Sequence, residues 1–351
     1  MKAIVAHGPH DLRIEERPDP GAPGAGEVRL RVQSGGICGS DLHYYHHGGF
    51  GTIRIKEPMI LGHEASGIVE ELGAGVSGLA IGDRVAINPS RPCENCEYCR
   101  RDMRNHCLDM VFSGSAMRFP HVEGMFREVL VVPAAQAVPV GAATDTGLAA
   151  LAEPFAVCLH AARQAGPLLG ASVLVSGCGP IGCLAVAAAR RAGAAHITAC
   201  DVVGEPLETA RKLGADTVID LGSDRSGLDA LKADKGRIDM VFECSGNPAA
   251  VTTAVECVRP RGRLVAVGNG GPVEFPLASL VAKEIEMVGS FRFDTEFALA
   301  ADLVSRQLVD LAPLISHRMP AGRAVEAFDL ASDRSQAMKV QLDLTDWTAA
   351  T

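Results

Sequence analysis

Four cysteines lie close together in the polar segment RPCENCEYCRRDMRNHC, with the spacing C-x2-C-x2-C-x7-C: Cys93, Cys96, Cys99 and Cys107. Thiolates at two-residue gaps can converge on one tetrahedral Zn²⁺ at about 2.3 Å each, and four of them leave no position open for a substrate. The pattern therefore predicts a structural zinc site. Two disulfides are the alternative, but C-x-x-C spacing favours a metal, and the opening MKAIVAHGPH does not read as a secretory signal.

A second group of metal-ligand types is spread over two motifs. Cys38, Ser40 and His43 lie in GGICGSDLHYY, and His63 and Glu64 follow in LGHEASGIVEELGAGV. Three ligands of the types Cys, His and carboxylate, with a fourth position left to water or substrate, are typical of a catalytic zinc site. Any one of these residues alone is more often structural, since a lone cysteine usually behaves as a small buried hydrophobe.

A glycine-rich turn indicates a dinucleotide. Gly177, Gly179 and Gly182 form G-x-G-x-x-G between the strand-like VLVS and the helix-like IGCLAVAAARRAG. The first glycine permits a tight turn, the second lets the backbone approach a pyrophosphate, and the third lets helix pack on strand. Asp201 ends the next strand, HITACD, where a carboxylate would bind an adenosine ribose and repel a 2′-phosphate, which favours NAD over NADP. The alternative is a glycine-rich turn beside a solvated aspartate.

The elements that must position these residues change in type along the chain. With 351 residues and 47% apolar content the chain suits two domains. The first 150 or so residues predict mostly antiparallel β-structure, with strands over 27–32, 67–72 and 84–87. From Glu153 short apolar strands alternate with Ala-rich helices, which predicts an α/β, doubly wound parallel sheet with strands over 173–176, 196–200, 217–220, 239–243, 263–267 and 286–290.

Charge and composition narrow the partners. The net charge of −9 argues against nucleic acid and anionic membrane surfaces, so a small-molecule partner is expected. The longest apolar run, 173–189, is interrupted by glycines and Pro180 and predicts no membrane span. His46 and His47 are expected in a glycine-flanked, strand-like loop that shapes the substrate site, and adjacent side chains there point opposite ways and do not share a metal. Six further cysteines predict buried thiols in a reducing, cytoplasmic compartment: Cys158, Cys178, Cys183, Cys200, Cys244 and Cys257.

Taken together and in order, these motifs resemble those of the zinc-dependent medium-chain dehydrogenases and reductases. C-G-S-D-L-H at 38–43, G-H-E-x-x-G-x-V at 62–69, G-D-R-V at 82–85, the four-cysteine segment, E-P at 153–154 and the glycine turn span nearly the whole chain. The resemblance implies a GroES-like β domain of residues 1–153 and 291–351, a Rossmann NAD-binding domain of residues 154–290, and a homotetramer or homodimer.

Within that family the chain resembles the polyol dehydrogenases of the sorbitol type, because Glu153 stands where the alcohol dehydrogenases proper have a second zinc cysteine. The segments HYYHHGGFGT at 43–52 and SAMRFPHVEG at 115–124 look still more like those of the L-idonate 5-dehydrogenase group. This implies an NAD-dependent enzyme that oxidises L-idonate to 5-keto-D-gluconate. The alternatives are a sorbitol- or xylitol-type dehydrogenase, a dinucleotide-binding protein that lost its chemistry, and a zinc-dependent nucleic-acid module, which the acidic charge disfavours.

The resemblance also implies residue roles, two zinc ions per chain and NAD. Cys38, His63 and Glu64 would bind the catalytic zinc, and Glu153 would either bind it or hold its water. Ser40 would accept the substrate hydroxyl proton and pass it through the cofactor ribose to His43. Substrate would contact Ser40, Tyr44, Arg118 and Arg292, and the cofactor would contact Gly177, Gly179, Pro180, Ile181, Gly182, Asp201, Ser245, Val267, Gly268 and Phe291. Pro206 lies where sorbitol-type enzymes often have an arginine near the ribose.

Overall fold

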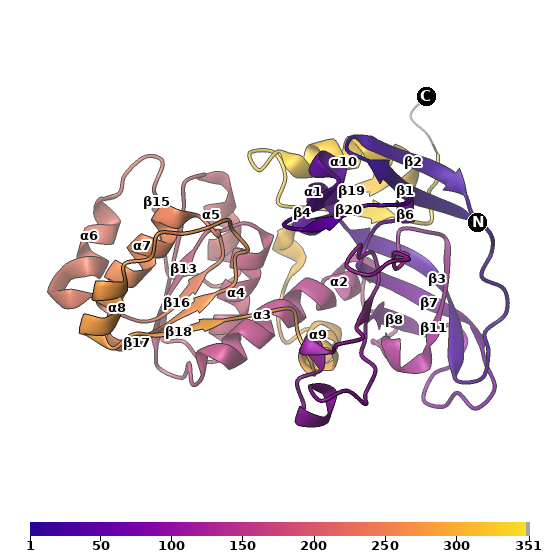
Figure 1. Ribbon diagram of the computed structural model, residues 1–351, viewed down its shortest axis with the longest axis horizontal. Helices are drawn as coiled ribbons and strands as arrows, with labels where there is room; N and C mark the ends of the chain where they lie inside the picture. The colour runs from indigo at the N-terminus through magenta and orange to yellow at the C-terminus, as the bar shows by residue number, and fades with distance from the viewer. Residues whose placement is uncertain (349–351) are drawn as a thin grey trace. The chain divides into compact units, whose positions relative to one another are not determined.

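The computed structural model describes residues 1–348 and divides the chain into two compact units (Figure 1). Unit 1 comprises Met1–Glu153, Phe297–Leu308 and the chain from Ile315 on, and unit 2 comprises Pro154–Glu296 and Val309–Leu314. Unit 1 is therefore assembled from segments at both ends of the sequence, while unit 2 is almost continuous.

Unit 1 is mostly β-structure. Its strands are β1 (Lys2–Gly8), β2 (Asp11–Glu16), β3 (Glu27–Gly36), β4 (Gly49–Phe50), β5 (Ile53–Arg54), β6 (Met59–Ile60), β7 (Glu64–Leu72), β8 (Arg84–Ile87), β9 (Ser90–Arg91), β10 (Val111–Phe112), β11 (Val129–Pro133), β12 (Ala137–Pro139), β19 (Ile315–Pro320) and β20 (Lys339–Asp343). The largest sheet has the order β12-β8-β7-β3-β20-β19, with β11 also paired to β3, and a smaller sheet has the order β2-β1-β6. The helices are α1 (Gly39–His47), α2 (Thr146–Ala150), α9 (Glu296–Ser305) and α10 (Ala324–Ser332).

Strand β3 organises this unit. Val28, Leu30 and Val32 are fully buried and alternate with arginines, as the two-residue period of a strand requires. At its end Gly36 pairs with Glu64 of β7 on one side and with Gln341 of β20 on the other. The antiparallel pairing thus brings the starts of β7 and β20 beside the segment that carries Cys38.

Unit 2 is the doubly wound part of the fold. Its parallel sheet has the order β15-β14-β13-β16-β17-β18 (Figure 1). The strands are β13 (Ser172–Ser176), β14 (His196–Asp201), β15 (Thr217–Asp220), β16 (Ile238–Glu243), β17 (Val258–Ala266) and β18 (Glu286–Gly289), and the helices are α3 (Ala152–Ala165), α4 (Pro180–Arg191), α5 (Glu205–Lys212), α6 (Ser226–Lys232), α7 (Pro248–Cys257) and α8 (Leu277–Lys283). The predicted fold class is confirmed, and all six predicted strands are present. No helix within residues 1–348 has both the length and the apolar character needed to cross a membrane.

One local prediction is wrong. His46 and His47, expected in a strand-like loop, lie in the last turn of helix α1, which ends at Gly48 in a left-handed conformation with φ 65°. Asp41 explains much of this, because its side chain accepts a hydrogen bond from the N–H of Cys38 at 3.0 Å and so satisfies a free donor at the start of the helix.

Candidate active site

The four cysteines of the polar segment converge. The sulfur atoms of Cys93, Cys96, Cys99 and Cys107 all lie within 4.8 Å of one another, and Sγ of Cys93 is 4.0 Å from Sγ of Cys99. Thiolates on one tetrahedral Zn²⁺ stand about 3.8 Å apart, so the spacing fits a metal. All eleven cysteines are free thiols, so the disulfide alternative does not hold here. We call this group the cysteine lobe.

Backbone N–H groups donate hydrogen bonds to sulfur atoms of the cysteine lobe, which stabilises the thiolate form. Sγ of Cys107 accepts hydrogen bonds from the N–H groups of Cys93 at 3.2 Å and Asp109 at 3.3 Å. Backbone hydrogen bonds from Cys99 and Leu108 lower the pKa of Cys96 to about 6. Burial instead raises the pKa of Cys99 to about 12. A cation is the group that would allow all four thiolates to exist together.

A second group, which we call the mixed cluster, lies in unit 1 and contains Cys38, His63 and Glu64, whose ligand atoms lie within 4.8 Å of one another. Cys38 precedes α1, and the other two residues lie at the start of β7. Burial, followed by the charge of Glu64, raises the pKa of the Cys38 thiol to about 11. Sulfur, imidazole nitrogen and carboxylate oxygen are the donor set of a catalytic zinc site, so these residues fit the ion.

Lys339 lies inside the mixed cluster. Its Nζ donates hydrogen bonds to both carboxylate oxygens of Glu64, at 2.8 and 2.9 Å, and to the carbonyl oxygen of Ile37 at 3.1 Å. The two side chains are 3% and 1% exposed, which makes this a buried ion pair. Burial alone would lower the pKa of Lys339, but the charges of Glu64 and Cys38 outweigh it and raise the pKa. Gly36 makes room for the pair, because a Cβ there would lie 2.1 Å from Oε2 of Glu64.

Asp41 contacts the segments that carry Cys38 and His63 of the same cluster. Its fully buried carboxylate accepts the N–H groups of Cys38 at 3.0 Å and Gly62 at 3.2 Å, and lies 3.7 Å from Nδ1 of His63. That nitrogen is buried and has no hydrogen-bond partner within residues 1–348. At 3.7 Å the carboxylate lies beyond hydrogen-bond distance of this nitrogen, so it places a negative charge beside the ring without bonding to it. Through its hydrogen bonds to Cys38 and Gly62, Asp41 ties together the two segments that carry Cys38 and His63, a contact that the sequence motifs did not indicate.

Glu153 and Ser40 border the mixed cluster. Oγ of Ser40 lies 3.5 Å from Nε2 of His63. Glu153 is 5% exposed and does not belong to the group of three, but burial, together with the charges of Glu64 and Cys38, raises its pKa to about 8. Its carboxyl is therefore near enough to these residues for their charges to act on its proton.

The remaining predicted substrate residues lie in different surroundings. His43 is exposed on α1, whereas Tyr44 is buried and its hydroxyl accepts the N–H of Ala116 at 2.9 Å. Arg118 forms an exposed ion pair with Asp109 at 3.0 Å. Arg292, in unit 2, has a left-handed backbone with φ 54°, and its guanidinium lies 5.0 Å from the ring centre of Phe291.

The predicted dinucleotide turn has the geometry that its glycines suggest. Gly177 has φ 88°, and a Cβ on Gly182 would lie 1.8 Å from the carbonyl oxygen of Gly177. Gly179 caps α4, which begins at Pro180 and continues through Ile181. Asp201 is 4% exposed at the end of β14, and its carboxylate accepts the N–H of Cys178 at 2.6 Å. The turn is therefore held in shape by the carboxylate expected to bind the ribose.

Glu243 fixes the segments that carry three other predicted cofactor residues, Ser245, Val267 and Gly268. The sequence analysis did not identify it. Its buried carboxylate accepts hydrogen bonds from the side chain and N–H of Ser245 and from the N–H of Gly246, the last two at 3.0 Å. Its carbonyl oxygen accepts the N–H groups of Val267 at 2.8 Å and Gly268 at 2.9 Å. One residue thus fixes both loops that follow β16 and β17. The only sequence signal was an acidic residue ending an apolar strand.

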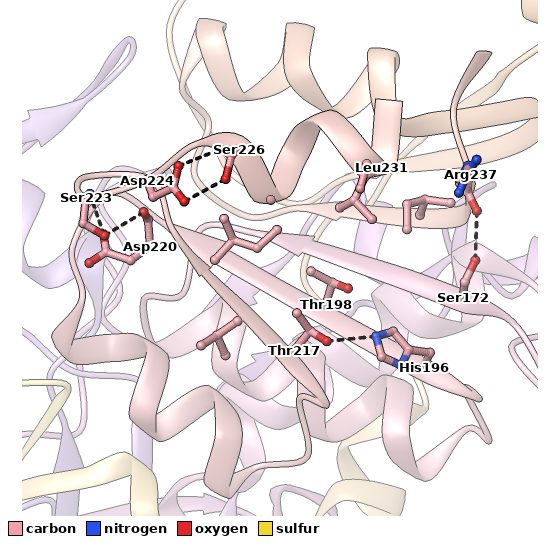
Figure 2. Close-up of a pocket in the computed structure, with 15 residues that line it drawn as sticks. Ser172, His196, Thr198, Thr217, Asp220, Ser223, Asp224, Ser226, Leu231 and Arg237 are labelled. Carbon is pink, nitrogen blue, oxygen red and sulfur yellow. Dashed lines mark hydrogen bonds between the residues drawn. The ribbon is translucent and has the colours of Figure 1, made fainter. Parts of the chain in front are cut away.

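Figure 2 shows a pocket of about 650 Å³ elsewhere on unit 2, beside β14, β15 and α6. Its polar side chains bond within the lining: Nε2 of His196 lies 3.1 Å from Oγ1 of Thr217, and Ser226 donates to Asp224 at 2.7 Å. No predicted metal or cofactor residue lines it, so this pocket is separate from the site described above.

Comparison with protein families gives two matches in chain order. Residues 24–142 match the alcohol dehydrogenase GroES-like domain, and residues 180–306 match the zinc-binding dehydrogenase domain. Together the two matches cover more than half of the chain and include all three residues of the mixed cluster and the predicted cofactor residues from Pro180 on, but not Gly177 and Gly179.

Individual relatives agree with these matches. L-idonate 5-dehydrogenase (NAD(P)(+)) of Escherichia coli is 46% identical over 314 residues, which cover 89% of this chain and 90% of that enzyme. Sorbitol dehydrogenase of Homo sapiens is 37% identical over 338 residues, which cover 93% and 91%. The crystal structure of the E. coli L-idonate enzyme superposes with a TM-score of 0.93 at 43% identity, covering 97% of each chain.

Proposed function

The chain belongs to the family of zinc-binding dehydrogenases with a GroES-like domain, and we propose that it oxidises a secondary hydroxyl of a sugar acid or polyol by hydride transfer to NAD. The observation that carries this proposal is the convergence of Cys38, His63 and Glu64 beside Ser40. When bound there, zinc supplies Lewis-acid stabilisation of negative charge on the substrate oxygen, and NAD accepts the hydride.

The protein's own residues supply binding, orientation and proton transfer. Ser40 takes the proton of the substrate hydroxyl, and exposed His43 releases it to solvent. Asp41 and Lys339 hold His63 and Glu64 in place. Glu153, whose pKa is raised by burial, provides a carboxyl that can bind the ion or hold its water.

We propose L-idonate as the substrate and 5-keto-D-gluconate as the product. The 46% identity to the E. coli enzyme of that name supports this over another polyol, since a sorbitol dehydrogenase of Gallus gallus is 37% identical and a probable D-xylulose reductase is 35% identical. A sugar acid carries a carboxylate that sorbitol lacks, and a guanidinium can bind it with two parallel hydrogen bonds. Arg292 is our first choice for this contact and Arg118 our second.

The test is a panel of L-idonate, sorbitol, xylitol and simple alcohols, each with NAD and with NADP, followed by reduced nicotinamide absorbance. We expect the highest kcat/KM with L-idonate and NAD, since the buried Asp201 carboxylate would repel a 2′-phosphate. Preference for sorbitol would reject the idonate assignment and keep the dehydrogenase, whereas NADP preference would reject the role of Asp201. No turnover with any pair in zinc-loaded protein would reject the function.

We also propose that the chain forms a homo-oligomer, a dimer or tetramer, in the cytoplasm. The eleven free thiols support a reducing compartment. Strand β18 is at the end of its sheet, and neighbouring apolar side chains are exposed: Leu277 at 64%, Val281 at 65% and Met287 at 43%. An edge strand flanked by exposed apolar groups can pair with the same strand of a second copy. Light scattering of wild type and Val281→Glu tests this, because the substitution should shift the mass toward the monomer.

A further inference from the structure

Helix α1 creates a histidine pair that the sequence motifs did not suggest. His43 and His47 are four residues apart within one continuous helix, Gly39–His47, so they lie on the same face one turn apart. Two histidines at this spacing on a helix are a recurring arrangement for binding Zn²⁺. The pair exists only because the chain stays helical through His47.

The two rings are placed for a shared ion. Their centres are 6.0 Å apart and their planes differ by 39°. Two imidazoles on one ion, each bound at about 2.0–2.1 Å, have ring centres about 5 Å apart, so a small side-chain rotation closes the difference. Both residues are exposed, and exposed side chains rotate freely on a short timescale.

His46, which lies between the two, differs from them because its ring already has a hydrogen-bond partner. Nε2 of His46 lies 2.6 Å from Oγ of Ser332, and its ring packs 5.0 Å from that of Tyr45 and 5.1 Å from that of His10. Neither His43 nor His47 forms a hydrogen bond or ion pair through its imidazole within residues 1–348. Their ring nitrogens are therefore available to a metal.

We propose that His43 and His47 form an inhibitory site for a divalent transition-metal ion, Zn²⁺ first, separate from the cysteine lobe and the mixed cluster. Two imidazole nitrogens bind the ion and waters fill its other positions, so this site is weaker than one with four protein ligands. The inhibition rests on the proposed function: an ion on the ring nitrogen of His43 occupies the lone pair that would receive the substrate proton. Excess zinc then slows oxidation without displacing the ions already bound.

The experiment starts from protein loaded with two zinc ions per chain and adds further Zn²⁺. Calorimetry measures binding to wild type, His43→Gln, His47→Gln and His46→Gln. We expect a third ion on wild type and on His46→Gln, and binding weaker by about tenfold or more in the other two variants. Equal binding to wild type and His47→Gln, or loss of binding in His46→Gln, would overturn the site.

Activity measures the second half of the proposal. Each variant's rate with added Zn²⁺ is divided by its own rate without it, so that a change in basal turnover does not count. We expect the half-inhibiting zinc concentration of His47→Gln to rise about tenfold or more over wild type, and that of His46→Gln to stay unchanged. Equal inhibition of wild type and His47→Gln would overturn it. If no substrate is turned over at all, the dehydrogenase proposal fails, and calorimetry alone decides the metal site.

Discussion

The cysteine lobe and the mixed cluster use similar atoms for opposite purposes. The lobe gathers four thiols from fifteen consecutive residues, and backbone N–H groups point at its sulfurs. The mixed cluster gathers three different side chains from two motifs and adds Lys339, 275 residues beyond Glu64. The lobe has ligands that only a metal can satisfy together, whereas the mixed cluster already contains a cation that partly neutralises its carboxylate.

This difference agrees with the roles proposed for the two clusters, structural for the lobe and catalytic for the mixed cluster. Four thiolates fill a tetrahedral ion and leave nothing to exchange. In the mixed cluster Glu64 is paired with the ammonium group of Lys339, and in the proposed function it would also bind a metal. A carboxylate with an alternative cation can leave the metal without becoming an uncompensated buried charge. The mixed cluster is therefore suited to changing its ligands, and the lobe to keeping them.

His63→Ala should have the largest effect and should act on one cluster alone. Removing a ligand of an ion that stabilises charge by several kcal/mol should lower kcat on the order of a thousandfold. Zinc analysis should fall from two ions to one per chain, while NAD binding, measured by fluorescence titration, should persist because the glycine turn lies in unit 2. Retained turnover in protein with one zinc would contradict the assignment of the mixed cluster.

The members of both clusters could be predicted from the sequence because they lie in compact motifs. The residues that hold them in place, Lys339 and Asp41, could not. Lys339 opens the strand KVQLD, whose alternation suggests that Lys339 and Gln341 face solvent. Both are buried, at 3% and 1%, because β20 lies between β3 and β19. Only the register of strands distant in sequence, such as Gly36 opposite Glu64, reveals the ion pair. Helix α1 was missed because its cap is the carboxylate of Asp41, to which the sequence analysis gave no role.

Lys339→Met should destabilise the metal-free protein more than the zinc-loaded protein. Removing one partner of a buried ion pair leaves Glu64 uncompensated and should cost about 3 kcal/mol of unfolding free energy in urea titrations after zinc removal. With zinc bound, the ion compensates the same carboxylate, so the loss should shrink. The double variant Lys339→Met, Glu64→Gln is the control, because it removes both charges and should recover stability. Equal losses with and without zinc would show that Glu64 does not alternate between the two cations.

Cys96→Ser tests whether the cysteine lobe contributes to stability and not to turnover. Losing one of four thiolates should weaken zinc binding there by about tenfold or more, which corresponds to about 1.4 kcal/mol or more. Because metal binding is coupled to folding, the melting temperature should fall, while the folded fraction should retain turnover per catalytic zinc. Cys257→Ser, in a buried thiol outside both clusters, controls for the general effect of losing a sulfur. A variant with normal stability and no activity would mean that the lobe takes part in the chemistry.

Glu153→Cys should give the smallest effect. It makes the surroundings of the mixed cluster more like the cysteine lobe, because it replaces a carboxylate with a second thiol. A second thiolate should keep zinc bound, but a softer ligand set makes the ion a weaker Lewis acid than one facing a carboxylate. We expect kcat/KM to fall about tenfold, or about 1.4 kcal/mol, with two zinc ions still present by metal analysis. Glu153→Gln separates charge from softness: if the carboxylate acts by its charge, the amide should lose at least as much activity as the thiol. If both variants have the kcat/KM of wild type, Glu153 takes no part in the reaction, and the mixed cluster of Cys38, His63 and Glu64 is sufficient for it.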